Sequence, residues 1–367
     1  MLITRTPVRV SFAGGGTDLP VFYEKYGGAV LSTTINKHFY TILTGRDDDL
    51  IQIISADIRV AETWRNIASI PTDHQTELEI PFAVLKSMDC KVGLNLFLAS
   101  EIPPGTGLGS SATVCVNLLR GISQYLRRSL SRYKIAETAF QIAREVLKKP
   151  VGKQDEYAAA FGGLNHIRFE AGSTSVERLE LPLDSLRRLE QSLLLYFTGA
   201  QHNSWAILEE QEKSSAQAGG QTVEALLAIK ELVEQMKDAL LAGDFHSFGR
   251  LLDVAWQHKK RLSSRISNDR IDMLYDLAKS KGALGGKITG AGGGGFLLLY
   301  CEPENQPQLI EAMKDAGLRQ MHFSFDLAGS QVIYDDPFLE QDPRGGSQWS
   351  YIPAEALSEL LGSTWKR

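Results

Sequence analysis

The segment from Ile102 to Ala112, which reads IPPGTGLGSSA, is the part of this chain that most constrains its fold. Three glycines alternate with other residues, and two serines then precede apolar residues spaced like one face of a helix. Backbone without a Cβ can approach a polyphosphate closely, and a helix start offers free N–H groups and a positive dipole end. Serine hydroxyls there can cap the helix or meet a metal ion. The segment predicts the floor of a nucleotide triphosphate site, although an ordinary glycine-rich turn before a capped helix explains it about as well on its own.

Two better-known nucleotide-binding patterns fail on spacing elsewhere in the chain. A Walker loop needs a glycine, four residues and then Gly-Lys followed by Ser or Thr. Neither Gly-Lys pair, at 152–153 and 286–287, has these neighbours. Residues 290–295 match the letters of the dinucleotide fingerprint G-x-G-x-x-G, but the apolar run Phe296–Tyr300 that follows predicts a buried strand. Because the fingerprint needs a helix there, the match is accidental.

Length, charge and cysteine usage narrow the class of protein. A chain of 367 residues exceeds a comfortable single core, so we expect two lobes. The net charge of −5 argues against a nucleic-acid-binding protein. No apolar run reaches membrane-spanning length, and the N-terminus lacks a charged segment followed by an apolar one. The three widely separated cysteines predict reduced core residues of a cytoplasmic protein, with neither a disulfide framework nor a zinc site.

Strand-like and helix-like patterns follow one another along the chain. Strands are expected at 3–13, 29–31, 38–44, 51–54 and 93–100. Helices are expected at 112–126, at 132–148 with Ser131 as its cap, and at 155–161. A polar break near 173–185 precedes a buried strand at 193–197, and long helices follow at roughly 202–217, 222–242, 245–261 and 268–281. A polar tail closes the chain, and the mixture of elements indicates the α+β class.

The glycine-rich segment resembles the second motif of the GHMP kinases, the superfamily of galactokinase, homoserine kinase, mevalonate kinase and phosphomevalonate kinase. Pro7–Asp18 resembles the first motif of that superfamily and Lys287–Gly295 the third, so three motifs stand in the expected order. The resemblance implies a two-lobed α+β fold with a ribosomal-protein-like N-terminal lobe, a ferredoxin-like C-terminal lobe and an active site in the cleft. We expect the lobes at 1–175 and 190–340, followed by a tail at 341–367.

The resemblance also implies phosphoryl transfer from ATP with Mg²⁺ as the cation. Such transfer needs a phosphate cradle, a cation, a group near the attacking hydroxyl and positive charge for the transition state. Magnesium prefers oxygen ligands, and Ser110 or Ser111 would provide one. Glu145 lies where the resemblance places the metal-binding glutamate, although its helix face otherwise resembles a solvated stripe. The residues expected to form the cradle are Pro104, Gly105, Thr106, Gly107, Leu108, Gly109, Ser110 and Ser111.

Asp155 and Arg9 are the candidate catalytic pair. Asp155 stands in a glycine-containing loop that enters a short helix, and in the family this position carries the catalytic aspartate. A carboxylate at a helix start is also a common structural feature because it meets free N–H groups. Glu156 competes for the role if the alignment slips by one residue. Arg9 is unusual within a strand-like stretch, so we expect it to project into the cleft and neutralise developing charge.

The first motif carries the signal for the substrate. Galactokinases have Gly-Glu-His-Thr-Asp there, whereas this chain has GGGTD at 14–18, which removes two side-chain contacts and opens space. The stretches 5–18 and 27–37 resemble the D-glycero-D-manno-heptose 7-phosphate kinases of bacterial GDP-heptose synthesis. A substrate that carries a phosphate needs additional cations in the cleft. The residues expected to contact substrate are Gly15, Gly16, Thr17, Asp18, Lys37, Lys153, His202, Gly292 and Gly293.

The leading interpretation is an ATP-dependent kinase that converts D-glycero-D-manno-heptose 7-phosphate to the 1,7-bisphosphate at the anomeric hydroxyl. Another sugar 1-kinase, of fucose, galactose or arabinose type, stays open, and so does a non-catalytic sugar sensor. A sensor has no need to keep Asp155, which argues against that alternative. The expected partners are a sugar phosphate and ATP, without nucleic acid or membrane, and the chain is expected to be a monomer or a homodimer.

Overall fold

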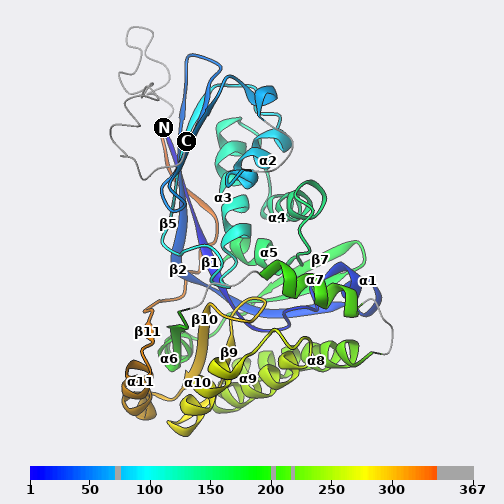
Figure 1. Cartoon of the computed structure of the whole chain (residues 1–367), viewed down its shortest axis with the longest axis vertical. Helices are drawn as coiled ribbons and strands as arrows, with labels where there is room; N and C mark the ends of the chain where they lie inside the picture. The colour runs from blue at the N-terminus through cyan, green and yellow to red at the C-terminus, as the bar shows by residue number, and fades with distance from the viewer. Residues whose placement is uncertain (71–75, 200–203, 216–219, 337–367) are drawn as a thin grey trace.

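The computed structural model describes residues 1–70, 76–199, 204–215 and 220–336, and it shows two lobes, each built around one sheet. In Figure 1 the larger first lobe forms the upper part of the molecule and the second lobe the lower part. Strands β1 (Leu2–Ala13) and β2 (Gly28–Gly45) run from the first lobe down toward the second. In the described part of the chain, no helix combines the length and the apolar character needed to cross a membrane.

The sheet of the first lobe is organised around β1 and β2, which pair antiparallel from Leu2 opposite Leu43 to Ala13 opposite Leu31. The strand order is β12-β1-β2-β5-β3-β4, with β6 pairing with β2 and β7 with β6. All of these pairs are antiparallel except β3 with β5. The other strands are β3 (Ile51–Ser55), β4 (Val60–Trp64), β5 (Leu94–Ser100), β6 (Asn165–Glu170), β7 (Ser173–Arg178) and β12 (Gln331–Asp335).

Helices cover one face of this sheet and position the glycine-rich segment. In Figure 1, α2 (Glu79–Ser87), α3 (Ser110–Tyr125) and α4 (Arg132–Gln141) lie on the same side of the long strands, with α5 (Gln154–Phe161) below them. The apolar stripe of α3 is buried in one cluster with residues of the sheet. Each large apolar side chain buried in this way contributes roughly 1.5–3 kcal/mol. A short helix, α1 (Pro20–Tyr26), follows the first motif.

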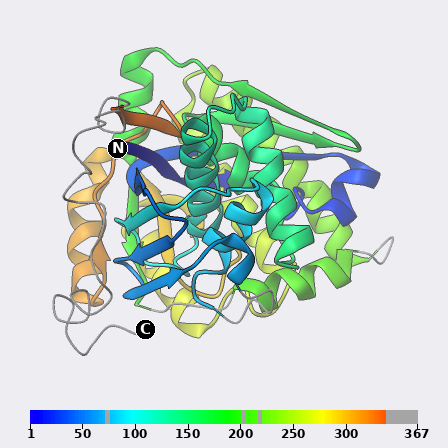
Figure 2. The ribbon, with the colours of Figure 1, turned by 90° about the horizontal axis from the view of Figure 1, so that it is seen from above.

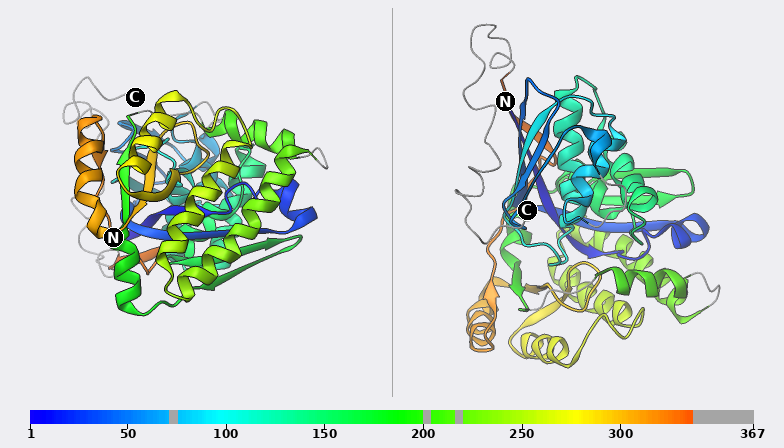
Figure 3. Two further views of the ribbon diagram at one scale, coloured as in Figure 1. Left: turned by 90° about the horizontal axis from the view of Figure 1, so that it is seen from below. Right: turned by 45° about the horizontal axis from the view of Figure 1, so that its top comes forward.

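The second lobe has a four-stranded sheet in the order β11-β8-β10-β9, and every residue of β10 (Phe296–Cys301) is buried. Seen from below in Figure 3, α8 (Gln221–Leu241) and α9 (Phe245–Lys260) lie side by side across the lobe. Figure 2 shows α11 (Gln306–Asp315) at one edge of the molecule. The other elements are α6 (Leu183–Ser192), β8 (Leu193–Phe197), α7 (Ser204–Ser215), α10 (Asp269–Ser280), β9 (Ala283–Ile288) and β11 (Arg319–Gln320).

A shared hydrophobic cluster joins the two lobes. Val8, Val10 and Phe12 of β1 belong to the same buried cluster as Phe248 of α9 and Phe296 of β10. The rings of Phe12 and Phe248 meet edge to face with centroids 5.2 Å apart, a favourable aromatic arrangement. Because β1 also carries the first motif, this packing fixes the position of that motif against the second lobe.

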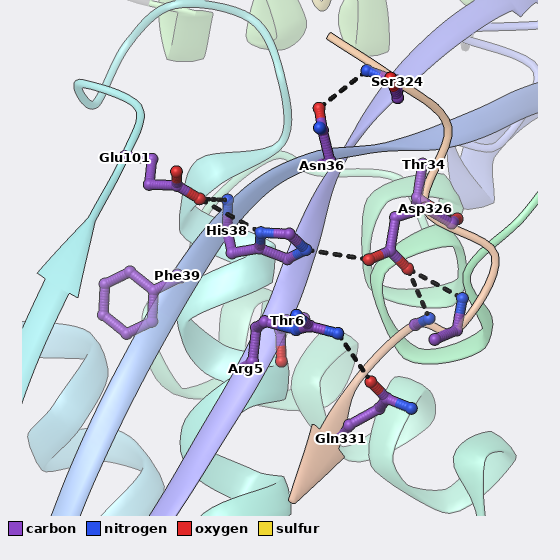
Figure 4. Close-up of polar contacts among 12 residues, drawn as sticks. Arg5, Thr6, Thr34, Asn36, His38, Phe39, Glu101, Ser324, Asp326 and Gln331 are labelled. Carbon is purple, nitrogen blue, oxygen red and sulfur yellow. Dashed lines mark hydrogen bonds and ion pairs between the residues drawn. The ribbon is translucent and has the colours of Figure 1, made fainter. Parts of the chain in front are cut away.

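The chain returns to the first lobe after it has formed the second. Strand β12 pairs with the free edge of β1, with Leu2 opposite Asp335. Figure 4 shows the buried His38 of β2 between two carboxylates: Nδ1 is 3.1 Å from Glu101 Oε2 and Nε2 is 2.9 Å from Asp326 Oδ2. Burial opposes ionisation of Asp326, but its hydrogen bonds, chiefly with His38, outweigh that effect and lower its pKa. Two more hydrogen bonds join this returning part of the chain to β1 and β2: Ser324 N donates to Asn36 Oδ1, and Arg5 Nη2 donates to Gln331 Oε1.

Most of the elements expected from the sequence form, although the strands expected at 29–31 and 38–44 are one continuous strand, β2. Cys90, Cys115 and Cys301 are free and buried as predicted. Ser131 caps α4 by accepting a hydrogen bond from Lys134 N at 3.2 Å, which confirms its prediction. The expected helix at 132–148 is α4 to Gln141 and then a π-helical segment, Ile142–Val146.

Two other expectations were wrong because the contacts that decide them are distant in sequence. The polar break at 173–185 contains β7, which pairs with β6, and the stretch after residue 301, for which no strand was expected, contains β12. Both strands have polar or exposed residues, so neither shows a buried-strand pattern. Residues 337–367 lie outside the described residues.

Candidate active site

A cavity of about 420 Å³ is lined by residues of both lobes. Its size suits a small-molecule site. The first lobe contributes Arg9, Asp155 and the glycine-rich segment to its wall, and the second contributes Lys259 and Gly290. Its lining also includes apolar side chains, namely Ile58, Leu78, Ile80, Pro81, Ile102 and Leu147. The motifs singled out in the sequence therefore face one space.

The glycine-rich segment forms a wall of this cavity with a backbone that favours glycine. Gly105, Gly107 and Gly109 have φ values of 74°, 80° and 79°, in the region that side chains rarely adopt. All three line the cavity with Pro104, Ser110 and Ser111, whereas Thr106 and Leu108 are buried. Helix α3 begins at Ser110, two residues earlier than predicted, and neither serine caps it. The wall thus presents glycine backbone and a helix start, which is the chemistry of an anion cradle.

The third motif packs directly against this cradle. A methyl group on Gly107 would lie 2.5 Å from the carbonyl oxygen of Thr289, and one on Gly290 would lie 2.6 Å from Gly107 Cα. A methyl group on Gly295 would lie 2.4 Å from the carbonyl oxygen of Thr106. The glycines therefore allow the two loops to touch. The third motif supports the cradle from the second lobe.

Arg9 and Asp155 form a two-point ion pair in the cavity wall. The Nε and Nη2 groups of Arg9 donate to Oδ1 and Oδ2 of Asp155 at 2.8 and 2.7 Å, and Nη1 donates to the carbonyl of Gly107 at 2.6 Å. The Arg9 side chain is 4% exposed and that of Asp155 is 27% exposed. Such planar pairing fixes the carboxylate more tightly than a lysine could. Asp155 therefore stays partly open to the cavity, in an orientation fixed by Arg9.

Asp18 fastens the first-motif turn to the loop that carries Asp155. Its Oδ1 accepts hydrogen bonds from Gly16 N at 2.8 Å and from Gln154 Nε2 at 3.1 Å, and its Oδ2 accepts from Gln154 N at 3.2 Å. Asp18 lines the cavity but is only 3% exposed. Burial and the nearby charge of Asp155 raise its pKa, partly offset by the backbone N–H groups. Asp18 thus positions Gln154 and, next to it, Asp155.

The space expected beside Gly15 and Gly16 is occupied by two amide side chains. A methyl group on Gly15 would lie 3.4 Å from Gln154 Nε2, and one on Gly16 would lie 2.0 Å from Gln211 Nε2. The loss of the galactokinase Glu and His therefore leaves no open volume at Gly16, because Gln211 of α7 reaches in from the second lobe. Gly15, Gly16 and both glutamines line the cavity.

Lys259 is the main site residue that the sequence reasoning missed. It lies near the end of α9, is 6% exposed, lines the cavity and donates a hydrogen bond to the carbonyl of Gly290. Burial, together with Arg9, lowers its pKa to about 8, against the smaller opposing effect of Asp18 and Asp155. Lys287 is buried beside it, and its pKa is also lowered, mainly by burial. A signal existed: Lys259 continues the apolar face of α9 after Leu252 and Ala255.

The other expected substrate residues do not line the cavity, as far as the structure describes them. Lys153 Nζ is 2.7 Å from Glu137 Oε1 and lies over the ring of Phe140. Lys37 is half-buried on β2, and Thr17 is fully buried, where its hydroxyl donates to the carbonyls of Gly14 and Ala29. Gly292 and Gly293 pack against the backbone of Ile266. His202 lies outside the described residues.

The carboxylate expected to bind a metal is not in the cavity wall. Glu145 is exposed, and its helical segment presents apolar residues to the cavity, namely Ala139, Ile142, Ala143 and Leu147. Glu156 instead lines the cavity and is 3% exposed, and burial together with Asp155 raises its pKa well above the usual range. Its Oε2 and the Oγ of Ser110 are buried without a hydrogen-bond partner among the described residues.

These unpartnered oxygens fit a hard cation that is shared with phosphates. No group of three His, Cys, Asp or Glu side chains in the described residues could hold a metal ion by itself. Magnesium needs few protein ligands, because it keeps several waters and binds substrate phosphates. One carboxylate and one hydroxyl beside a phosphate cradle can therefore suffice, and Glu156 and Ser110 carry the unpartnered carboxylate and hydroxyl oxygens among the described residues that line the cavity.

Two family models match the chain. The GHMP kinases N-terminal domain matches residues 79–163, and the GHMP kinases C-terminal domain matches residues 236–318. The first match contains the cradle and Asp155, and the second contains Lys259 and the third motif. The two matches therefore cover both walls of the cavity.

Named relatives cover most of the chain. It is 33% identical over 330 residues to D-glycero-alpha-D-manno-heptose 7-phosphate kinase of Campylobacter jejuni, across 89% of this chain and 97% of that protein. It is 27% identical to L-fucokinase/L-fucose-1-P guanylyltransferase of Bacteroides fragilis over 81% of this chain, but spans only 34% of that longer protein. A crystal structure of a D-glycero-D-manno-heptose 1-phosphate kinase from Bacteroides thetaiotaomicron superposes with a TM-score of 0.75 at 27% identity. That match covers 91% of this chain and 100% of the other.

Proposed function

This chain belongs to the GHMP kinase family, and on that premise we propose that it transfers the γ-phosphoryl group of ATP to the anomeric hydroxyl of D-glycero-D-manno-heptose 7-phosphate. The observation that carries the proposal is the Arg9–Asp155 pair beside the glycine-rich cradle. A methyl group on Gly109 would lie 3.2 Å from Asp155 Oδ2, so the carboxylate stands next to the start of α3. A carboxylate in that place can orient an attacking hydroxyl and accept its proton.

The cradle and the apolar side chains of the cavity lining contact different parts of the nucleotide. Glycine backbone from Gly105 to Gly109 and the N-terminus of α3 bind the phosphates. The apolar side chains of the lining, among them Leu78, Pro81 and Ile102, can contact a flat base. Asp155 lies at the end of the cradle where α3 begins, so the γ-phosphate faces the acceptor there.

Ser110 and Glu156 would hold the magnesium ion that accompanies ATP. The ion supplies positive charge that neutralises the developing charge on the phosphates. Glu156 takes the role that the sequence suggested for Glu145, because only Glu156 lines the cavity. Burial and the charge of Asp155 raise the pKa of Glu156, and a bound cation would favour its ionised form.

Lys259 gives the second-lobe wall a cation for a phosphorylated acceptor. Its Nζ donates a hydrogen bond to the backbone carbonyl of Gly290, and the charges of Asp18 and Asp155 partly offset the lowering of its pKa by burial. A phosphate on the sugar would offer the ammonium group a strong, charge-assisted partner. This favours a phosphorylated sugar over free fucose or galactose as the acceptor.

The decisive experiment is ADP release from the purified full-length chain with a panel of acceptors. The panel holds D-glycero-D-manno-heptose 7-phosphate, the corresponding heptose 1-phosphate, L-fucose and D-galactose, because the relatives' names place the phosphate differently. We expect the 7-phosphate to be preferred and phosphorus NMR of its product to show a new phosphate at the anomeric carbon. Preference for fucose would establish the fucose-type alternative, and no ADP release with any sugar would support a sensor.

A further inference from the structure

Two amide side chains at the first-motif turn carry polar atoms that no described residue satisfies. The Oε1 atom of Gln154 and the Nε2 atom of Gln211 are buried and have no hydrogen-bond partner in the parts of the chain that the structure describes. Both residues line the cavity. An unsatisfied buried polar group costs about 1–3 kcal/mol. The two atoms therefore indicate a ligand that brings the missing partners.

The orientation of the Gln154 amide is fixed by its neighbour. Its Nε2 is 3.1 Å from Asp18 Oδ1, and Asp18 also accepts from the backbone N–H groups of Gly16 and Gln154. Both carboxyl oxygens of Asp18 accept hydrogen bonds from backbone N–H groups, so the NH₂ end of the amide is the end that pairs with Asp18. The Oε1 end is then an acceptor that remains available to a ligand.

Gln211 reaches the same turn from the other lobe. It lies on α7, is 4% exposed, and places Nε2 within 2.0 Å of where a methyl group on Gly16 would be. Gln154 lies against Gly15, and Gln211 lies against the next residue, Gly16. The turn is thus flanked by one free acceptor and one free donor.

We propose that Gln154 and Gln211 bind two neighbouring ring hydroxyls of the sugar acceptor, Gln154 by accepting a hydrogen bond and Gln211 by donating one. This assignment rests on the proposed function, since it concerns the sugar of that reaction. A hydroxyl both donates and accepts, so a pair of adjacent hydroxyls can satisfy both amides. A phosphate could not, because its oxygens would face the Oε1 acceptor of Gln154. The glutamines therefore hold the ring, and the acceptor's own phosphate lies elsewhere.

The assignment gives Asp18 an indirect role. Its carboxylate accepts three hydrogen bonds from the protein and fixes which end of Gln154 faces the cavity. Asp18 is thus a positioning residue for the sugar site. It also explains why two glycines follow Gly14, because side chains at Gly15 and Gly16 would compete with the amides for the same place.

The test replaces Gln211 with leucine in the full-length chain and measures KM for D-glycero-D-manno-heptose 7-phosphate and for ATP. We expect Gln211→Leu to lower kcat/KM for the sugar by roughly 10- to 100-fold, as for the loss of a hydrogen bond to a buried partner, with KM for ATP nearly unchanged. Gln154→Leu should act in the same direction. The control is Gln257→Leu, an exposed glutamine on α9, which should change neither constant.

A substrate analogue separates recognition from a general effect on folding. The 2-deoxy form of the heptose 7-phosphate removes a ring hydroxyl next to the reacting one, and wild type should use it poorly. Gln211→Leu or Gln154→Leu should discriminate less between the two sugars than wild type does. If Gln211→Leu unfolds, Gln211→Glu keeps the size but lacks the donor, and it should lose sugar affinity in the same way.

The outcomes for the inference and for the proposed function are distinct. Wild-type activity on the heptose phosphate, with unchanged sugar KM in both glutamine variants, would overturn the inference and leave the kinase assignment standing. Absence of ADP release from wild type with every sugar would instead remove the proposed function.

Discussion

The two walls of the cavity hold their buried charges in opposite ways. In the first-lobe wall, Arg9 gives two hydrogen bonds to Asp155 and a third to the backbone, so its charge is fully paired within the protein. In the second-lobe wall, Lys259 donates to a backbone carbonyl and has its pKa lowered to about 8, chiefly by burial. The Arg9–Asp155 pair is therefore complete in the protein alone, whereas Lys259 gains from an anion.

This difference suggests separate roles: the Arg9–Asp155 pair orients a reacting group, and Lys259 binds an incoming anion. A paired guanidinium holds a carboxylate in a fixed plane, which suits a group that must meet a hydroxyl in one geometry. A compact ammonium with an incomplete set of partners suits a phosphate that enters and leaves. Glu156 is the acidic counterpart of Lys259, since it too is buried without a full set of partners. The predictions below test whether paired and unpaired charges have these separate roles.

The largest effect is expected at the paired wall. Asp155→Asn should lower kcat by roughly 10²- to 10⁴-fold, the usual range for a positioned acid–base group, while ATP affinity barely changes. Turnover is measured by ADP release and ATP affinity by calorimetry. Because the change leaves the buried Arg9 without its carboxylate, a melting curve must accompany it. A folded Asp155→Asn protein with near-normal turnover would remove the assignment and promote Glu156.

The paired wall also contains most of the cavity-lining residues that the sequence singled out. Arg9, Asp155 and the cradle lie in short segments whose residue types are unusual for their surroundings, so they could be found without the fold. Lys259 and Gln211 lie on long helices, where lysine and glutamine are ordinarily solvated, and only tertiary packing turns them toward the cavity. Glu145 shows the converse, since a resemblance suggested a metal ligand where the helix turns the side chain outward.

A second prediction tests the contact between the walls. Gly107→Val should weaken ATP binding by roughly 10- to 100-fold, because the side chain meets the carbonyl of Thr289 and the residue has a positive φ. Gly243→Val is the matched control, since Gly243 also has a positive φ but nothing within 4 Å of an added methyl group. Calorimetry showing unchanged ATP affinity in Gly107→Val would place the nucleotide elsewhere in the cavity.

A third prediction concerns the unpaired carboxylate. Glu156→Gln should weaken binding of Mn²⁺, used in place of Mg²⁺ with a non-hydrolysable ATP analogue, by at least about tenfold. Glu145→Gln should leave Mn²⁺ affinity unchanged because that side chain is exposed and outside the cavity wall. Electron paramagnetic resonance of free Mn²⁺ provides the measurement without any turnover. The reverse pattern, with loss only in Glu145→Gln, would return the metal to the position first expected.

A fourth prediction addresses the unpaired cation. Lys259→Met should raise KM for the heptose phosphate by roughly tenfold, as for the loss of one charge-assisted hydrogen bond, and change KM for ATP much less. Lys260→Met is the control, because Lys260 is half-buried, does not line the cavity, and pairs through Nζ with Asp272 Oδ1 at 3.3 Å. An equal rise in both KM values in Lys259→Met would assign Lys259 to the phosphates of ATP instead.

The smallest effect is a pH dependence of stability that follows from the same lysine. Its pKa is about 8 in the folded protein and about 10.5 when unfolded. Between these values the unfolded chain binds more protons, so the contribution of Lys259 to stability rises with pH across this window. Below pH 8 the folded protein carries the full cost of a buried ammonium group, and Lys259→Met removes that cost. The melting temperature of Lys259→Met should therefore exceed that of wild type by a few degrees at pH 7, with the gap closing toward pH 10. The KM of the wild-type protein for the phosphorylated sugar should rise above pH 8, because the ammonium group that binds the phosphate loses its proton there. A melting-temperature gap that stays constant from pH 7 to 10 would mean that the folded protein compensates the charge of the Lys259 ammonium group fully and does not lower its pKa, and the contrast between the two walls would fail.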